Sequence, residues 1–288
     1  MSGVSATLQE SSIVEGLRLG RVGRQVEVHG TVDSTNRLAW RRLAEGGADG
    51  LVVLAEHQSA GRGRFGRRWE CPRGAGVLMS LALQEPLTRR GREAARSQGD
   101  RRASPAAACQ GLNGNTLALL SAAAAVDAIE RATGVSAEIK WPNDLVVRGR
   151  KLGGILIESQ PSSGWFVMGI GINCLQHRRH FPAEWQSSAT SLELETDQPV
   201  DRTPVVRQLL VELDRWLTDP GRWQADVLRA EWLRRALPLG GLIHLRQAGE
   251  EFVGQVLDVD PSAGLVVQLV GGGRRWFDAA NTSVVAYA

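Results

Sequence analysis

Four arginines and three glycines are concentrated in the segment from Gly61 to Trp69, which reads GRGRFGRRW. Arginine guanidinium groups form paired hydrogen bonds with phosphate and carboxylate oxygens, and glycine lets the backbone approach a ligand closely. The segment therefore favours the binding of an anionic ligand. The alternative is a solvated basic surface loop, which the segment alone does not exclude.

The same segment formally matches GxGxxG, but its context excludes the common nucleotide-binding folds that use this pattern. A dinucleotide-binding fold needs a helix directly after the loop, whereas here residues 70–74 lead into a predicted strand. A protein kinase would need HRD and DFG motifs downstream. A P-loop would need GxxxxGK[ST]. None of these motifs is present in the sequence.

Lysine is almost absent from this sequence. Of 34 lysine and arginine residues only two are lysines, Lys140 and Lys151, and they lie within one stretch of twelve residues. Because an ammonium group is a compact point charge and a guanidinium group is a planar fork, the two are not equivalent where geometry is tight. Lys151 precedes Gly153 and Gly154 in a predicted strand, so it could reach a ligand carboxylate or phosphate. The alternative is an exposed lysine in a hairpin.

A second pair of strand glycines, Gly169 and Gly171, lies in the segment from Val167 to Asn173. Residues two apart in a strand point to the same face, so this face carries no side chain at two successive positions. Such a surface suits either a flat apolar ring of a ligand or a closely packed helix. The sequence leaves both alternatives open.

Alternating and apolar segments predict the strands that must position these residues. Strands are expected at residues 25–32, 51–55, 77–83, 138–141, 145–147, 152–158 and 165–172. The capping residues at 33–36 predict a helix that follows them. Periodicity predicts three further helices, at 116–132, 203–218 and 222–236. Residues 148–150 form the turn of a hairpin, and residues 176–188 are expected to form a loop.

These elements indicate an α+β fold with three parts: an N-terminal lead at residues 1–24, a larger domain at 25–236 and a small β-rich domain at 237–288. In the last part, short β-rich runs alternate with glycine and aspartate turns. Residues 86–115 are polar, alanine-rich and arginine-rich without a clear period. We therefore predict a mobile surface insertion there.

The composition is that of a soluble globular protein, with 43% hydrophobic and 23% charged residues. No apolar segment is long enough to span a membrane, and residues 1–23 lack the apolar core of a signal peptide. The three cysteines, Cys71, Cys109 and Cys174, form no CxxC pair, which favours a cytoplasmic location. The net charge of +3 derives from residues 86–115, which hold six arginines and two acidic residues. It therefore gives little support to nucleic-acid binding by the fold.

Five segments together resemble the biotin–protein ligase family, also called holocarboxylase synthetases, in their order and spacing. They are DSTN at 33–36, Gln58 with GRGRFGRRW at 61–69, KWPND at 140–144, KLGGI at 151–155 and GIGIN at 169–173. Each segment alone is weakly specific, whereas five in order are not expected by chance. Residues 237–288 are similar to the family's small C-terminal domain, with less specific motifs. The family's N-terminal DNA-binding winged helix is not found before the first strand, so we expect a form without it.

The resemblance implies a catalytic domain like that of class II aminoacyl-tRNA synthetases, with a mixed sheet flanked by helices, followed by an SH3-like β-barrel. It implies a ligase that uses biotin, ATP and Mg²⁺ to form biotinyl-5′-AMP and then transfers biotin to a lysine. The acceptor would be a biotin carboxyl carrier protein domain of the acetyl-CoA carboxylase type. The resemblance implies no protein-bound metal site and no DNA or membrane partner, and it leaves open whether the protein is a monomer or a weak homodimer.

The resemblance also assigns roles to single residues. Residues implied to bind biotin are Ser34, Thr35, Asn36, Gln58, Gly61, Arg62, Gly63, Arg64, Lys151, Gly153 and Gly154. Residues implied to bind ATP or the adenylate are Arg62, Arg64, Arg67, Trp69, Asn143, Lys151 and Asn173. Lys151 and Arg64 are implied to be catalytic, because a carboxylate that attacks a phosphate brings two anions together and cations stabilise that transition state.

Two other functions stay open at this point. A lipoate–protein ligase shares the fold and the chemistry, but its arginine-serine-triple-glycine segment is not found in this sequence. A nucleotide- or nucleic-acid-binding regulator would use the arginine-rich segments, leave carrier proteins unmodified, and bind RNA or DNA in a salt-dependent way.

Overall fold

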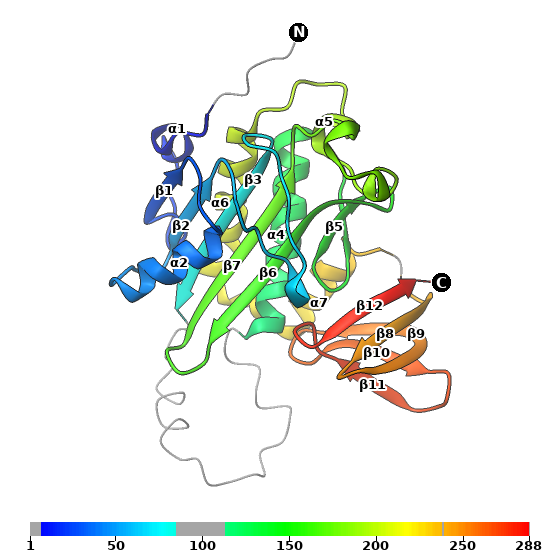
Figure 1. Ribbon diagram of the computed structural model, residues 1–288. Coiled ribbons are helices and arrows are strands. Elements are labelled where there is room, and N and C mark those ends of the chain that lie inside the picture. Colours follow the sequence, from blue (N-terminus) through cyan, green and yellow to red (C-terminus); the bar gives the residue numbers. More distant parts are fainter. Residues whose placement is uncertain (1–6, 85–112, 238, 288) are drawn as a thin grey trace.

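The computed structural model describes residues 7–84, 113–237 and 239–287, which form a mixed α and β fold with two sheets (Figure 1). The α-helices of this part of the chain are α1 (Glu10–Val14), α2 (Thr35–Ala44), α4 (Gly114–Thr133), α5 (Leu192–Glu195), α6 (Arg202–Thr218) and α7 (Ala225–Leu233). None of the described helices is both long enough and apolar enough to cross a lipid bilayer.

The larger sheet of the described chain has seven strands in the order β1-β2-β3-β7-β6-β5-β4. These strands are β1 (Gln25–His29), β2 (Leu51–Ala55), β3 (Gly76–Gln84), β4 (Glu138–Lys140), β5 (Asp144–Val147), β6 (Arg150–Gln160) and β7 (Trp165–Asn173). β1 and β2 are parallel, whereas the other neighbours in the sheet are antiparallel. The sheet is therefore mixed, as the sequence predicts.

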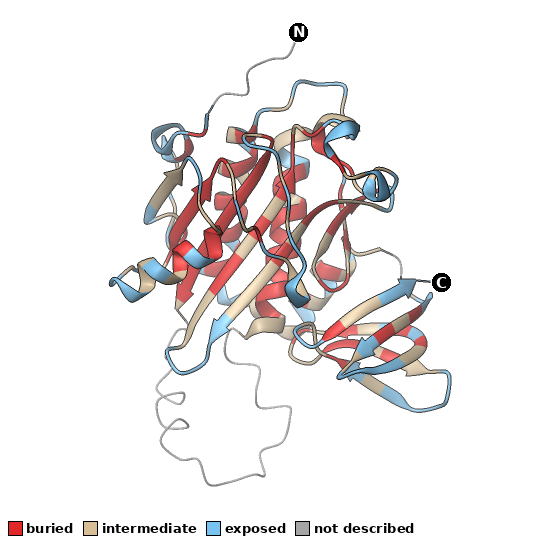
Figure 2. Ribbon diagram, in the orientation of Figure 1, coloured by how far each residue is buried: buried red, intermediate tan, exposed pale blue. Residues whose placement is uncertain are grey.

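Helices α4 and α6 cover one face of this sheet (Figure 1). The main core of buried residues lies between these two helices and the sheet (Figure 2). α4 begins after Asn113, whose side chain accepts a hydrogen bond from the backbone N–H of Thr116 at 2.9 Å. It ends at Gly134, which has a φ of +72° and so a left-handed conformation that glycine adopts easily. The predicted insertion at 86–115 is therefore wrong in its C-terminal boundary, because Asn113 caps α4 and residues 114 and 115 belong to that helix. Residues 86–112 lie outside the described residues.

The opposite face of the sheet carries α2 and, beside it, the arginine-rich loop, whose Trp69 lies against β7. Strand pairing aligns three rows of residues on this face: Leu78–Gly171–Gly154, Ser80–Gly169–Leu156 and Ala82–Val167–Glu158. The third row is covered by α2, whose buried Leu38 and Ala39 pack on Ala82 and Val167. The first two rows contain three glycines, so a shallow surface lies beside the first turn of α2.

The smaller sheet of the described chain has five antiparallel strands in the order β11-β10-β9-β8-β12. They are β8 (Leu242–Gln247), β9 (Glu250–Asp260), β10 (Gly264–Leu269), β11 (Arg274–Phe277) and β12 (Thr282–Tyr287). This sheet contacts the start of α4, since Asn115 donates a side-chain hydrogen bond to the carbonyl of Ser262 at 3.0 Å. It also contacts α7 through an ion pair of 2.7 Å between Arg229 and Asp258.

Two predicted elements differ from the structure. The helix expected at 222–236 is shorter, because a separate 3₁₀ turn at Pro220–Trp223 precedes α7. Asp219 caps that turn by accepting a hydrogen bond from the N–H of Gly221 at 3.0 Å. The N-terminal lead also contains α1, whose Ile13 is fully buried. A single buried side chain in a five-residue helix gives no periodic signal that a sequence pattern could show.

Candidate active site

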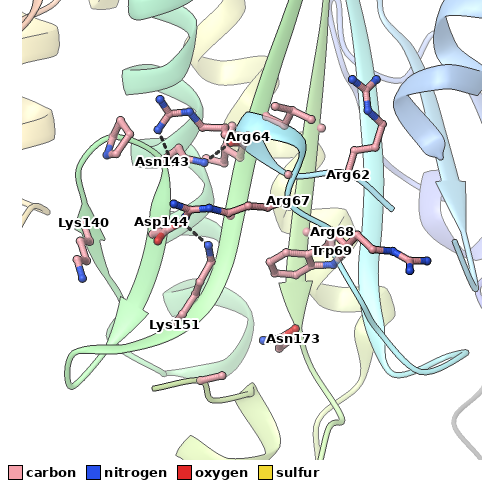
Figure 3. Close-up of a pocket in the computed structure, with 18 of the residues that line it drawn as sticks. Arg62, Arg64, Arg67, Arg68, Trp69, Lys140, Asn143, Asp144, Lys151 and Asn173 are labelled. Carbon is pink, nitrogen blue, oxygen red and sulfur yellow. Dashed lines mark hydrogen bonds and ion pairs between the residues drawn. The ribbon is translucent and has the colours of Figure 1, made fainter. Parts of the chain in front are cut away.

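A cavity of about 720 Å³ lies on the glycine-bearing face of the large sheet, a volume typical of sites for small ligands. It is lined by the start of α2, the arginine-rich loop, the β4–β5 turn, β6 and β7, and the 181–189 segment. Strand β12 of the small sheet forms a further wall. Figure 3 shows the side chains that converge there.

The bare face of β7 is covered by side chains of the protein itself. A methyl group placed on Gly171 would lie 2.7 Å from the ring of Trp69, so the absence of a side chain lets the indole lie against the strand. Gly169 gives room to the side chain of Asn36 in the same way. At Gly171 the glycine thus accommodates an indole of the protein itself instead of a ligand ring, and at Gly169 it accommodates a side chain of helix α2, which matches the alternative of a closely packed helix.

One end of the cavity is neutral, polar and buried. Ser34, Thr35 and Asn36 are each less than 5% exposed. Gln58 accepts a hydrogen bond from the backbone N–H of Thr35 at 2.8 Å. Ser80 Oγ lies 2.8 Å from the hydroxyl of Thr35 and 2.6 Å from the amide oxygen of Asn36, and its single proton serves one of these two bonds at a time. Hydroxyl and amide groups of this kind can both donate and accept hydrogen bonds. The end suits an uncharged group with both donors and acceptors, such as an amide or a urea.

Arg62 anchors the arginine-rich loop to the wall of the cavity. Its guanidinium group forms an ion pair of 2.7 Å with Glu158. Glu158 also accepts hydrogen bonds from Asn36 at 3.1 Å and from the indole N–H of Trp40 at 3.3 Å. Arg62 lines the cavity but points away from Lys151 (Figure 3). Its contacts therefore fix the position of the loop, and the guanidinium already has an anionic partner.

Arg64 is a largely buried cation with neutral partners. It donates hydrogen bonds to the side-chain oxygen of Asn143 at 3.1 Å, to the carbonyl of Thr282 at 2.6 Å and to the carbonyl of Ala279. Burial lowers the pKa of Arg64 to about 10. Among the described residues, no carboxylate lies within 4.0 Å of its guanidinium group. The carboxylates of Asp144 and Asp278 stabilise its charge only from a distance. A largely buried cation without a direct anionic partner is unfavourable, so this position is suited to an anionic ligand.

Lys151 lies at the same end of the cavity. Its Nζ forms an ion pair with Asp144 Oδ1 at 2.5 Å and lies 5.9 Å from the centre of the Trp69 ring. The side chain of Arg67 extends toward this pair, whereas Arg68 points away from it (Figure 3). Three cationic side chains, Arg64, Arg67 and Lys151, thus converge on one end of the cavity, with Asp144 as an acidic partner.

The amides of Asn143 and Asn173 fix the turns around the cationic end. Asn143 donates to the carbonyl of Ile155 at 2.6 Å, which ties the β4–β5 turn to β6. Asn173 donates to the carbonyl of Thr190 at 3.0 Å and accepts from Gln176 at 2.9 Å. Both asparagines line the cavity.

The structure brings together all but two of the site residues that the sequence predicts. Gly61 and Gly153 are not part of the cavity wall. Gly61 pairs with Trp69 through a backbone hydrogen bond of 3.1 Å within the loop. A methyl group on Gly153 would lie 2.7 Å from the carbonyl of Gly171. Both glycines therefore allow two parts of the backbone to approach each other, and they do not face a ligand.

The sequence analysis did not single out Asp144, which lines the cavity, or two residues behind the wall, Ser80 and Glu158, which bond to residues of the wall. Ser80 and Glu158 come from strands on either side of β7 and lie in adjacent rows of the face that carries α2. A polar residue in an otherwise apolar strand was the available signal for each of them. Asp144 belongs to the KWPND segment, where a turn role accounts for the residue type equally well.

The cavity has one end suited to a neutral polar group and another suited to an anionic group, and comparison with known proteins identifies the family of the chain. Residues 29–174 match the biotin/lipoate A/B protein ligase family, and the chain belongs to this family.

Relatives cover most of the chain. The bifunctional ligase/repressor BirA of Bacillus subtilis is 30% identical over 277 residues, covering 94% of this chain and 78% of the relative. The biotin–[acetyl-CoA-carboxylase] ligase of Mycobacterium tuberculosis is 34% identical over 259 residues, covering 87% and 85%. A structure of the Aquifex aeolicus biotin protein ligase in complex with biotin and ATP superposes with a TM-score of 0.66 at 22% identity, covering 91% and 98%. That structure shares the fold.

Proposed function

We propose that this chain is a biotin–protein ligase, which forms biotinyl-5′-AMP from biotin and ATP and transfers biotin to a lysine of a carrier protein. The observation that carries the proposal is a single cavity with a neutral polar end at α2 and a cationic end at Arg64, Arg67 and Lys151. Relatives at 34% and 33% identity, from Mycobacterium tuberculosis and Paracoccus denitrificans, are named biotin–[acetyl-CoA-carboxylase] ligases.

Biotin would bind with its ureido ring at the neutral end, where Ser34, Thr35 and Gln58 supply hydrogen-bonding groups. A urea has a carbonyl acceptor and two N–H donors, and hydroxyl and amide groups can match both kinds. The biotin tail would then run along the glycine rows. Its carboxylate would reach the cationic end near Lys151.

ATP would bind with its phosphates among Arg64, Arg67 and Lys151 and with its adenine near Trp69. In the first step a carboxylate oxygen of biotin attacks the α-phosphorus, a new O–P bond forms, and the bond to pyrophosphate breaks. Because both reactants are anions, the cations reduce their repulsion and stabilise the charge that develops. Asn143 positions Arg64 for this role through their hydrogen bond.

Mg²⁺ would enter with ATP as part of the substrate. Mg²⁺ is usually held by one or two carboxylates together with substrate phosphates and water. Asp144 fits this requirement, since it is a partly exposed carboxylate in the wall of the cavity. Binding of the ion by Asp144 would also release Lys151 from its ion pair.

In the second step the amine of the carrier lysine attacks the acyl carbon of the adenylate, and AMP leaves with the bonding electrons. The arginine-rich loop would shield the adenylate from water until the carrier arrives. The loop is suited to this because Arg62 and Arg64 attach it to opposite walls of the cavity. The partner is a carrier domain of the acetyl-CoA carboxylase type.

We further propose that residues 25–236 form a catalytic domain of the class II aminoacyl-tRNA synthetase type, and that residues 237–288 form an SH3-like domain. The seven-stranded mixed sheet and the five-stranded antiparallel sheet support these assignments. A cytoplasmic location is supported by Cys71 and Cys174, which are free thiols in the structure.

Biotin-dependent exchange of labelled pyrophosphate into ATP tests the first step. We expect exchange with biotin and none with lipoate, followed by biotinylation of an added carrier domain at its target lysine. Exchange with lipoate but not with biotin would show that the substrate is assigned incorrectly. Salt-sensitive RNA or DNA binding without carrier modification would favour the regulator instead.

A further inference from the structure

Lys140, one of the two lysines of the chain, has no role in the proposed chemistry. Its side chain points away from the pair formed by Lys151 and Asp144 (Figure 3). Its Nζ lies 4.7 Å from the centre of the ring of Tyr287, within the range of a cation–π interaction. Tyr287 is the only tyrosine of the chain. A rare cation and a unique aromatic residue thus meet across the two sheets.

Tyr287 also binds the backbone next to Lys140. Its hydroxyl donates a hydrogen bond to the carbonyl of Trp141 at 2.9 Å. Trp141 is only 4% exposed and packs into the main core, so the carbonyl is held by a rigid segment. At neutral pH the hydroxyl of Tyr287 is protonated and able to donate this bond. The end of β12 is therefore attached to the β4–β5 turn by two contacts from one side chain.

These contacts are part of a closed ring of hydrogen bonds and backbone segments around the cationic end of the cavity. From Trp141 the β4–β5 turn leads to Asn143, which accepts a hydrogen bond from Arg64. Arg64 donates in turn to the carbonyl of Thr282, the first residue of β12. The strand then leads back to Tyr287 and to Trp141. The position of Arg64 thus depends on two segments, the turn and β12, and Tyr287 sets the distance between them.

We propose that Lys140 and Tyr287 are positioning residues that clasp β12 to the β4–β5 turn and thereby hold Arg64 at the phosphate end of the nucleotide site. The inference rests on the proposed function. It assigns the pair to nucleotide binding, since neither side chain contacts the neutral end at Ser34, Thr35 and Gln58. Loss of the clasp weakens ATP binding and leaves biotin binding unchanged.

The test measures pyrophosphate exchange over a range of ATP concentrations for four variants: Tyr287→Phe, Tyr287→Leu, Lys140→Arg and Lys140→Met. Tyr287→Phe keeps the ring and removes the hydrogen bond, and we expect the KM for ATP to rise about fivefold. Lys140→Met removes the cation and should raise it about threefold. Lys140→Arg retains a cation that can stack on the ring and should remain close to wild type. Tyr287→Leu removes both contacts and should have the largest effect.

Arg246→Met provides the matched control. Arg246 is an exposed cation of β8 in the same sheet, it pairs with Glu251 at 2.5 Å, and it is not part of the cavity wall. Its removal should leave the KM for ATP unchanged. Biotin affinity, measured without ATP from tryptophan fluorescence, should be unchanged in all five variants.

The outcomes separate the clasp from the proposed function. A wild-type protein without biotin-dependent exchange contradicts the proposed function itself. If the wild type is active and Tyr287→Phe and Lys140→Met keep its KM for ATP, the clasp is overturned. A parallel loss of ATP binding, biotin binding and thermal stability also overturns it, because the contacts would then only stabilise the fold.

Discussion

The guanidinium group of Arg64 is charged, largely enclosed and hydrogen-bonded to neutral oxygens. An enclosed cation gains most from an anion that binds beside it, because hydrogen bonds between charged groups are stronger than neutral ones. The contribution of Arg64 should therefore appear mainly when the adenylate is bound. In the proposed arrangement, the clasp of Lys140 and Tyr287 on β12 determines the position of the Arg64 guanidinium group relative to the ligand.

Replacement of Arg64 by glycine should weaken the hold on the adenylate by about 10- to 100-fold, the loss expected for charged hydrogen bonds. The released adenylate would then acylate lysines of bystander proteins. Labelling of added serum albumin with biotin and ATP measures this escape. Arg73→Gly is the control just after the loop, because Arg73 is exposed, bonds the carbonyl of Gly30 and is not part of the cavity wall. Carrier-only labelling by Arg64→Gly would contradict the role of Arg64.

Replacement of Lys151 by alanine should slow adenylate formation by roughly 100-fold or more, the scale of a lost transition-state charge contact. Its Nζ lies at the end of the cavity where the biotin carboxylate and the α-phosphate would meet. Single-turnover formation of biotinyl hydroxamate measures the step. Arg148→Ala removes a cation from the same hairpin, outside the cavity wall, and should have no effect. A near-normal rate for Lys151→Ala would refute the assignment.

At the scale of elements, the first turn of α2 carries the neutral end of the site and is held by Asp33. Arg41 donates two hydrogen bonds of 3.0 Å to Asp33. These bonds, together with one from the N–H of Ser34, lower the pKa of Asp33 from 3.8 to about 2. A carboxylate with a lowered pKa in the folded state contributes stability above pH 3.8, and that contribution is lost as the pH falls toward 2.

Asp33→Asn should therefore lower the free energy of unfolding at pH 7 by less than about 1 kcal/mol, because the ion pair lies at the surface. The difference from wild type should shrink between pH 3.8 and pH 2. Urea unfolding at a series of pH values measures it. Asp197→Asn changes an exposed aspartate elsewhere and should show no such dependence. A constant difference across the pH range would exclude the ion pair as its cause.

The sequence predicts the positions of strands better than it predicts which side chains of different strands meet. The strand at 51–55 has the expected bounds because a short apolar run is flanked by turn residues. The predicted site residues other than Gly61 and Gly153 line one cavity, although their roles in binding stay predictions. The sequence marks Ser80 and Glu158 only as polar residues in strands. Their place beside the site depends on the register between three strands, which a local pattern does not give. The same holds for Tyr287, which meets Lys140 across two sheets.

At the scale of the whole molecule, the start of α4 joins the two sheets. Asn115 bonds to Ser262 and accepts a hydrogen bond from the N–H of Ala279 at 3.1 Å, close to the carbonyl that Arg64 contacts. Asn113 caps the same helix. A shortened version of the chain should therefore keep Asn113, which caps α4, and Asn115, which joins α4 to the small sheet.

Replacement of residues 86–112 by a flexible glycine-serine linker should leave both half-reactions intact. Extending the replacement through Asn115 should lower stability by about 1 kcal/mol for the lost cap alone, and should also raise the KM for ATP through the loosened small sheet. Thermal unfolding and pyrophosphate exchange of the two versions make the comparison. Equal behaviour of the two would contradict a joining role for Asn113 and Asn115.

The scarcity of lysine has a consequence for a protein that makes an acylating agent. Guanidinium groups stay protonated near neutral pH and are not nucleophiles, so the 32 arginines of the chain do not attack the acyl carbon of a mixed anhydride such as biotinyl-5′-AMP. Both lysine amines are engaged, one with a carboxylate and one with an aromatic ring. The chain therefore offers its own acyl-adenylate only two lysine amines, and an amine-directed label would report on the cavity wall, which both lysines line.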